Sequence, residues 1–110
     1  METLSIEKIK KYVNEGNLRW TNHIAIRLLQ RNITQEDVEL ALLNGEIIEK
    51  YADDYPFPSC LVLGINKDNK YIHIVCGSNG TELWLITAYY PSKTEWEDDL
   101  KTRKENNENE

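Results

Sequence analysis

The hydrophobic pattern of this 110-residue chain changes its period once, near residue 45. Before that point, apolar residues recur three and four positions apart, as on the buried side of a helix. After it, they alternate with polar residues or form short runs between turns. Capping residues at Ser5, at Thr21 or Asn22, and at Thr34, with stop signals at Gly16 and Gly45, divide the first part into three predicted helices.

Four strands are predicted in the second part, at 47–51, 59–65, 71–76 and 82–90. The connections between them are short and rich in turn residues, and Asn79-Gly80 is typical of a hairpin. Consecutive strands joined by short turns pair antiparallel. We therefore expect an α+β fold in which the N-terminal helices pack on one face of a four-stranded antiparallel sheet.

The length is enough for one domain with one core. We expect residues 1–102 to form this domain, ending in a short C-terminal helix or tail, and residues 103–110 to be a disordered acidic tail. No apolar run approaches the ~20 residues needed to cross a bilayer. The first residues do not resemble a signal peptide, so a cytoplasmic protein without a membrane partner is predicted.

The net charge of −6 conceals an uneven distribution. Residues 1–31 carry six basic and three acidic side chains, whereas residues 95–110 carry three basic and seven acidic ones. The charge of the whole chain argues against nonspecific nucleic-acid binding. A basic face in the first third can still bind RNA.

His23, Arg27 and Arg31 are four residues apart within the second predicted helix. This spacing places them along one side of a helix over about two turns. The planar guanidinium group matches phosphate oxygens, so the row is a candidate phosphate-binding surface. Alternatively, the arginines pair with acidic side chains and the histidine bonds a backbone carbonyl.

RNA cleavage without a metal needs a base, an acid and a cation for the phosphate, and histidine suits the first two roles. Further candidates for the same site are His73 on the third predicted strand, and Tyr51 and Tyr89 at strand ends. Alternatively, His73 is a surface strand residue and the tyrosines are packing residues. The predicted catalytic residues are His23, Arg27, Arg31, His73 and Tyr89, and the predicted phosphate- or RNA-binding residues are Arg27, Arg31 and Tyr51.

A metal or cofactor is not expected. Cys60 and Cys76 lie in apolar strands without CxxC spacing, which favours buried thiols over a zinc site or a disulfide. Asp53-Asp54 resembles a metal-binding pair, but adjacent carboxylates are also common in turns. A metal-dependent nuclease that uses these two aspartates is the third and last of the functional hypotheses.

Several short motifs occur in a characteristic order and spacing. They are Trp20-Thr21-x-His23-x-Ala25-x-Arg27, Arg31-x-Ile33-Thr34-x-x-Asp37-Val38, Asn44-Gly45-Glu46-Ile47-Ile48-Glu49-x-Tyr51, Asp54-x-Pro56-x-Pro58-Ser59-Cys60, His73-Ile74-Val75 and Ile86-Thr87-x-Tyr89-x-Pro91. Together, over about residues 18–98, they resemble the bacterial and archaeal family called domain of unknown function 4258. That family is grouped with RelE- and BrnT-like toxins.

The resemblance implies a RelE-like fold and a metal-independent endoribonuclease of a type II toxin–antitoxin pair, with His23, Arg27, Arg31 and either His73 or Tyr89 at its site. It also implies RNA, including mRNA, as substrate and a cognate antitoxin with a CxxC zinc finger; a homodimer is a further expectation. The acidic balance departs from the basic character of ribosome-dependent toxins. The alternative is a non-catalytic interaction or RNA-binding module of the same fold.

Overall fold

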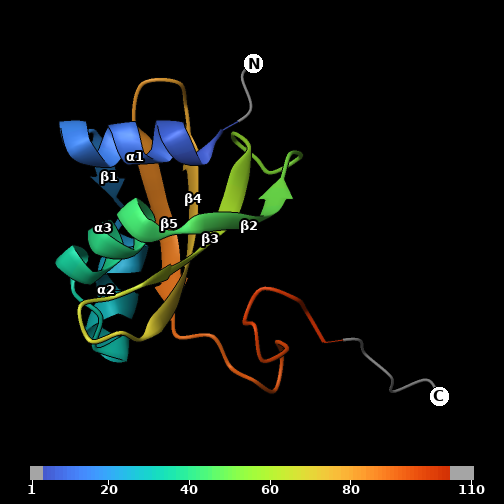
Figure 1. Cartoon of the computed structure of the whole chain (residues 1–110). Coiled ribbons are helices and arrows are strands. Elements are labelled where there is room, and N and C mark those ends of the chain that lie inside the picture. Colours follow the sequence, from blue (N-terminus) through green and yellow to red (C-terminus); the bar gives the residue numbers. More distant parts are fainter. Residues whose placement is uncertain (1–3, 105–110) are drawn as a thin grey trace.

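The structure is a computed structural model that describes residues 4–104, and it confirms the α+β class (Figure 1). The helical part comes first and is interrupted by one short strand; four longer strands follow. In chain order the elements are α1 (Ile6–Glu15), β1 (Leu18–Trp20), α2 (Asn22–Arg31), α3 (Gln35–Asn44), β2 (Glu46–Tyr51), β3 (Ser59–Ile65), β4 (Tyr71–Ser78) and β5 (Leu83–Tyr89).

The three helices begin and end where local side-chain chemistry predicts. The hydroxyls of Ser5 and Thr21 each accept a hydrogen bond from a backbone N–H in the first turn of their helix. Thr34 and Asp37 form a reciprocal capping box at the start of α3. Gly16 ends α1 in the left-handed conformation, at φ 74°. The predicted helices are therefore confirmed.

The sheet differs from the prediction. It has five strands in the order β1-β5-β4-β3-β2, and β1 runs parallel to β5, so the expectation of four antiparallel strands is wrong. The strand that the sequence did not predict, β1, lies between Gly16, which ends α1, and Thr21, which caps α2. It has only three residues, too few to show a hydrophobic period. Its pairing begins where the Leu83 N–H donates to the Asn17 carbonyl, at 2.9 Å.

The helices lie on one face of the sheet, as predicted, and we call this the inner face (Figure 1). α2 packs against β5, and α3 packs against β3 and β4. The apolar core of the inner face includes Ile24, Leu28, Val38, Leu42, Val62, Ile72, Ile74, Leu83 and Leu85. At Gly64 the backbone of β3 comes so close to Ala41 of α3 that a Cβ would overlap the helix backbone.

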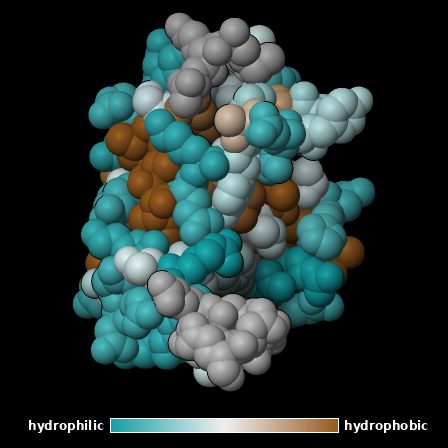
Figure 2. All heavy atoms as spheres, turned by 90° about the vertical axis from the view of Figure 1, so that its right-hand side faces the viewer, coloured by the Kyte–Doolittle hydropathy of each residue, from teal (hydrophilic) through white to brown (hydrophobic). Residues whose placement is uncertain are grey.

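The opposite, outer face carries no helix. It is crossed instead by residues 92–104, the C-terminal strap, which contain no helix and return from β5 across the sheet (Figure 1). Trp96 and Leu100 of the strap are buried against Leu61 and Leu63 of β3, forming a second, smaller core. Seen from the side of β2 and the strap, hydrophobic patches lie among hydrophilic side chains (Figure 2).

The strap includes the first residue of the predicted disordered tail, residues 103–110. This residue, Arg103, forms a β-bridge with Trp96 and an ion pair with Glu49, so it belongs to the outer face. The rest of the predicted tail, from residue 105, lies outside the described residues. Within residues 4–104, no helix is both long enough and apolar enough to span a membrane.

Candidate functional site on the outer face of the sheet

The predicted cationic row lies on α2, but its three members have different surroundings. His23 is exposed on the first turn. The Arg27 guanidinium donates to the Gln30 side chain at 3.2 Å. Nη1 of Arg31 donates to the Ala88 carbonyl at 2.8 Å and reaches the Thr87 hydroxyl at 3.3 Å, so Arg31 binds the part of β5 that β1 does not cover. The three residues thus share a helix but differ in exposure and in hydrogen-bond partners.

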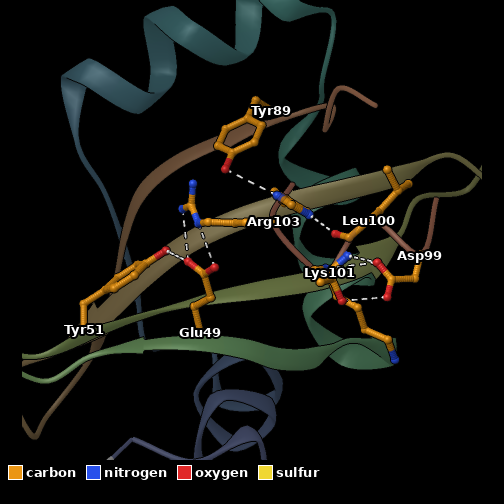
Figure 3. Close-up of polar contacts among 9 residues, drawn as sticks. Glu49, Tyr51, Tyr89, Asp99, Leu100, Lys101 and Arg103 are labelled. Atoms are coloured by element: carbon orange, nitrogen blue, oxygen red, sulfur yellow. Dashed lines mark hydrogen bonds and ion pairs between the residues drawn. The ribbon is translucent and has the colours of Figure 1, made fainter. Parts of the chain in front are cut away.

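A second group of polar side chains gathers on the outer face, and we call it the outer-face cluster. It consists of Glu49, Tyr51, His73, Tyr89 and Arg103. Register places His73 directly opposite Tyr89 on neighbouring strands, whereas Glu49 and Tyr51 come from the edge strand β2. Arg103 reaches them from the strap. Figure 3 shows Arg103 lying above Glu49, with Tyr51 and Tyr89 on either side.

His73 is fully buried, so the interpretation of it as a surface strand residue is wrong. The reason is the strap: Trp96 packs edge-on against the imidazole, at 4.5 Å between ring centroids, and the Leu100 carbonyl lies 2.6 Å from Nε2. Because a carbonyl oxygen can only accept, Nε2 carries the proton. Nδ1 is then the acceptor for the Tyr89 hydroxyl, at 3.3 Å.

Burial also determines the protonation states of His73 and Tyr89. Loss of solvent lowers the pKa of His73 below its ordinary value, although the Leu100 carbonyl opposes the shift, so the ring is neutral at pH 7. Burial raises the pKa of Tyr89, which keeps its hydroxyl protonated. Arg31 is among the charges that act on Tyr89, so one member of the helical row lies near the cluster.

Glu49 is the anionic centre of the cluster. Arg103 donates to both carboxylate oxygens, Nε to Oε2 at 2.8 Å and Nη2 to Oε1 at 3.1 Å, and the Tyr51 hydroxyl donates to Oε1 at 2.6 Å. The Arg103 hydrogen bonds hold the pKa of Glu49 below its usual value. Burial, followed by the bond to Glu49, raises the pKa of Tyr51 to about 12. The carboxylate is therefore ionised and the phenol protonated at neutral pH.

This arrangement keeps proton donors and an acceptor beside a cation at a partly open surface. The Arg103 side chain is 59% exposed and that of Glu49 is 23% exposed, so both can be reached from solvent. The Arg103 guanidinium also lies over the Trp96 ring, 4.6 Å from its centroid, which fixes its position. A carboxylate base, phenolic donors and an arginine suit acid–base chemistry at a phosphate.

The structure thus brings together three of the predicted residues, His73, Tyr89 and Tyr51. Among residues 4–104, no hydrogen bond or ion pair links His23 or Arg27 to them. The sequence places Glu49 in one of the family motifs, but neither Glu49 nor Arg103 is among the predicted site residues. Glu49 stands two positions before Tyr51 on a strand, a spacing that places both on one face, and this signal could have identified it.

The cysteine pair and the aspartate pair lie in different surroundings. Cys60 and Cys76 are buried free thiols on the inner face, with their sulfurs 4.0 Å apart, as predicted. Asp53 and Asp54 are exposed, and Asp54 accepts a hydrogen bond from the Ser59 hydroxyl, which is turn chemistry. In the described part of the chain, no three His, Cys, Asp or Glu residues lie close enough to hold a metal ion.

Comparison with known proteins identifies the family. Residues 20–90 match the family described as Domain of unknown function (DUF4258), and the chain belongs to it. No curated protein and no solved structure matches the chain. The matched range contains Glu49, Tyr51, His73 and Tyr89, whereas the strap with Arg103 lies beyond it.

Proposed function

We propose that this protein is a metal-independent endoribonuclease whose active centre is the outer-face cluster. The observation that carries the proposal is the ionised Glu49 carboxylate, which lies between a protonated phenol and an exposed guanidinium. A base, a proton donor and a phosphate-binding cation are the three groups that metal-free RNA cleavage requires. The proposal includes a place among RelE- and BrnT-like toxins and action in the cytoplasm.

The chemistry assigns one role to each accessible group. Glu49 takes the proton of a ribose 2′-hydroxyl, and the oxygen attacks the adjacent phosphorus. The bond from phosphorus to the 5′-oxygen breaks, leaving a 2′,3′-cyclic phosphate, and Tyr89 turns its hydroxyl proton from His73 Nδ1 to the departing oxygen, which it protonates. Arg103 stabilises the additional negative charge on the phosphate. The neutral His73 orients the Tyr89 hydroxyl through Nδ1 and makes no contact with the substrate.

Arg31 and Arg27 have a supporting role in this proposal. Arg31 is anchored to β5 beside Tyr89 and would bind a neighbouring phosphate, while the more distant Arg27 and His23 would contact RNA farther along. RNA, with mRNA among its forms, is the substrate class. A cognate antitoxin, expected to carry a CxxC zinc finger, is the proposed protein partner.

Cleavage of a fluorescent RNA oligonucleotide by purified protein tests the proposal, with Glu49→Gln as the decisive variant. One positioned acid–base group contributes about 10²–10⁴-fold, so we expect a loss of at least about 100-fold. Glu46→Gln is the matched control, because Glu46 lies on the same strand and its only described ion pair, with Lys101, is exposed. The control should cleave like the wild type.

Two further variants locate the active centre. Tyr89→Phe should reduce cleavage while leaving RNA binding intact. If Arg27→Ala or His23→Ala abolishes cleavage and Glu49→Gln does not, the active centre is on α2 and the present assignment is wrong. Regulated expression in a bacterial host gives the cellular readout: growth arrest and RNA decay with the wild type, but not with folded Glu49→Gln.

One observation favours the alternative, a non-catalytic interaction or RNA-binding module. α2 exposes Ile26 and Leu29 beside Arg27, at 56% and 85% exposure, a mixture of apolar and cationic groups typical of a protein-binding surface. RNA binding that weakens with salt but never leads to cleavage would support this alternative. Cleavage that is constant through neutral pH and is lost at acidic pH, where Glu49 takes up a proton, would support the ribonuclease.

A further inference from the structure

A pocket of about 310 Å³ opens on the outer face, at the opposite end of β5 from Tyr89. Its lining is mostly aromatic and comes from the loop between β2 and β3 and from β5. The lining residues are Asp54, Tyr55, Pro56, Phe57, Trp84 and Ile86. Neither the predicted site nor the outer-face cluster uses any of them.

The walls of this pocket are built by a close contact between the loop and the sheet. Gly77 is the strand neighbour of Trp84, and a Cβ at Gly77 would lie 2.7 Å from the Pro58 carbonyl oxygen and 2.9 Å from the Phe57 ring. Glycine therefore allows the loop to lie on the sheet. As a result, Phe57 packs against Trp84, with ring centroids 5.8 Å apart and planes inclined by 51°.

Two features of the pocket indicate a ligand with polar edges. The indole N–H of Trp84 is buried and, among the described residues, has no hydrogen-bond partner. Buried donors are normally paired, so a ligand that offers an acceptor to Trp84 would satisfy it. Asp54 on the rim supplies a carboxylate acceptor for a donor on the same ligand.

Tyr55 and Arg19 narrow the class of ligand. The Tyr55 side chain is 94% exposed, which leaves its ring free to stack on a planar group. The Arg19 guanidinium lies over the Trp84 ring, 5.2 Å from its centroid; its side chain is 56% exposed, and its Nη2 donates to a Glu82 carboxylate oxygen at 3.1 Å. A flat aromatic ligand with donors and acceptors, and with an attached anion that competes with Glu82 for Arg19, matches this combination.

We propose that the pocket binds one nucleobase of an RNA, stacked against Tyr55 and Trp84, with the adjoining phosphate beside Arg19. This inference rests on the proposed function, since it gives the same enzyme a base-binding subsite. Gly77 and His73 are four residues apart on β4, or about 13 Å. A short oligonucleotide can therefore place one base in the pocket and a phosphate at Arg103.

Binding is tested without relying on cleavage. The four ribonucleoside 5′-monophosphates are titrated into ¹⁵N-labelled protein while the indole N–H signals are followed by NMR. We expect a saturable shift of the Trp84 signal, assigned with Trp84→Phe, and smaller changes at Trp20 and Trp96. One base should shift Trp84 at lower concentration than the others.

Tyr55→Ala is the key variant, because a residue so exposed can be removed without unfolding the protein. Loss of one stacking ring should weaken nucleotide binding by about fivefold or more. Tyr71→Ala, which removes another exposed tyrosine from β4, is the matched control and should bind like the wild type. Equal affinity of wild type and Tyr55→Ala, or no saturable shift at Trp84, would overturn the proposal.

Failure of the subsite and failure of the ribonuclease can be distinguished. If nucleotides shift Trp84 but no RNA is cleaved, the base pocket stands and the endoribonuclease is wrong. If RNA is cleaved while Trp84 remains unchanged, the pocket is wrong and the endoribonuclease stands. A Trp84 shift with a proline-rich peptide, but not with nucleotides, would overturn the nucleobase assignment in favour of a protein ligand.

Discussion

The two faces of this sheet are made by the same strands but are covered in different ways. Three helices cover the inner face over a large core of apolar side chains. On the outer face, an irregular strap covers a small apolar core and leaves a network of ionisable groups at its margin. The inner face is therefore the source of stability, and the outer face is where chemistry is available.

The difference follows from how each cover is held. Helices bring their own backbone hydrogen bonds and an apolar stripe, so they can close completely over a sheet. The strap has few regular hydrogen bonds, and it is held by Trp96 and Leu100, by Arg103 and by its carbonyl bond to His73. The polar groups that hold the strap on the outer face remain partly exposed to solvent, so they can also bind a ligand.

The largest expected difference between the faces comes from two glycine substitutions. Gly64→Ala should cost about 3 kcal/mol or more of unfolding free energy, because its Cβ would overlap the backbone of α3, which is fixed by packing. Gly77→Ala should cost less, about 1–2 kcal/mol, because its Cβ would lie 2.7 Å from the Pro58 carbonyl oxygen, whereas the Cβ at Gly64 would lie 2.0 Å from that of Ala41. Chemical denaturation measures both losses, and equal losses would contradict the contrast.

Removing the main anchor of the strap tests the outer face directly. Trp96→Ala should lower the unfolding free energy by about 2 kcal/mol, below the roughly 3–5 kcal/mol usual for a buried Trp→Ala change, because the strap can detach while the sheet stays folded. Hydrogen exchange should show rapid loss of protection at Leu100 and Lys104, with β3 unchanged. Lys93→Ala, an exposed strap residue, is the control. Loss of protection in β3 as well would mean that the strap is part of one cooperative unit.

The same contrast explains what the sequence could predict. The helices were predictable because Ser5, Thr21 and Thr34 are local caps and the apolar period is long. Four of the five strands were predictable for similar reasons. β1 was not predicted, because three residues carry no period and a parallel partner far along the chain leaves no local signal.

The candidate site was only partly predictable for a related reason. His73, Tyr89 and Tyr51 could be identified by residue type and strand position. The burial of His73 depends on a segment more than twenty residues later, Leu100 being 27 residues away. Arg103 lies among charged residues without a pattern, so only the folded structure reveals its pairing with Glu49.

The smallest expected effect is a pH dependence of stability that originates at His73. Its folded-state pKa lies below the ordinary value, mainly through burial, so the unfolded chain binds more protons as the pH falls below about 6.5. Stability should therefore be full above that pH and decline as the pH drops toward the folded-state pKa. Denaturation of His73→Gln between pH 7.5 and 5 should give a flatter curve than the wild type.

His23→Gln provides the matched control for this measurement, because His23 is exposed on α2 and lies outside the outer-face cluster. The pKa of Glu49 is also lowered, chiefly by Arg103, but its contribution is lost only at more acidic pH, below the usual carboxyl range. The chosen interval therefore isolates the imidazole. If His23→Gln flattened the curve as much as His73→Gln, the buried histidine would not be the source, and the strap would not be responsible for the neutral ring.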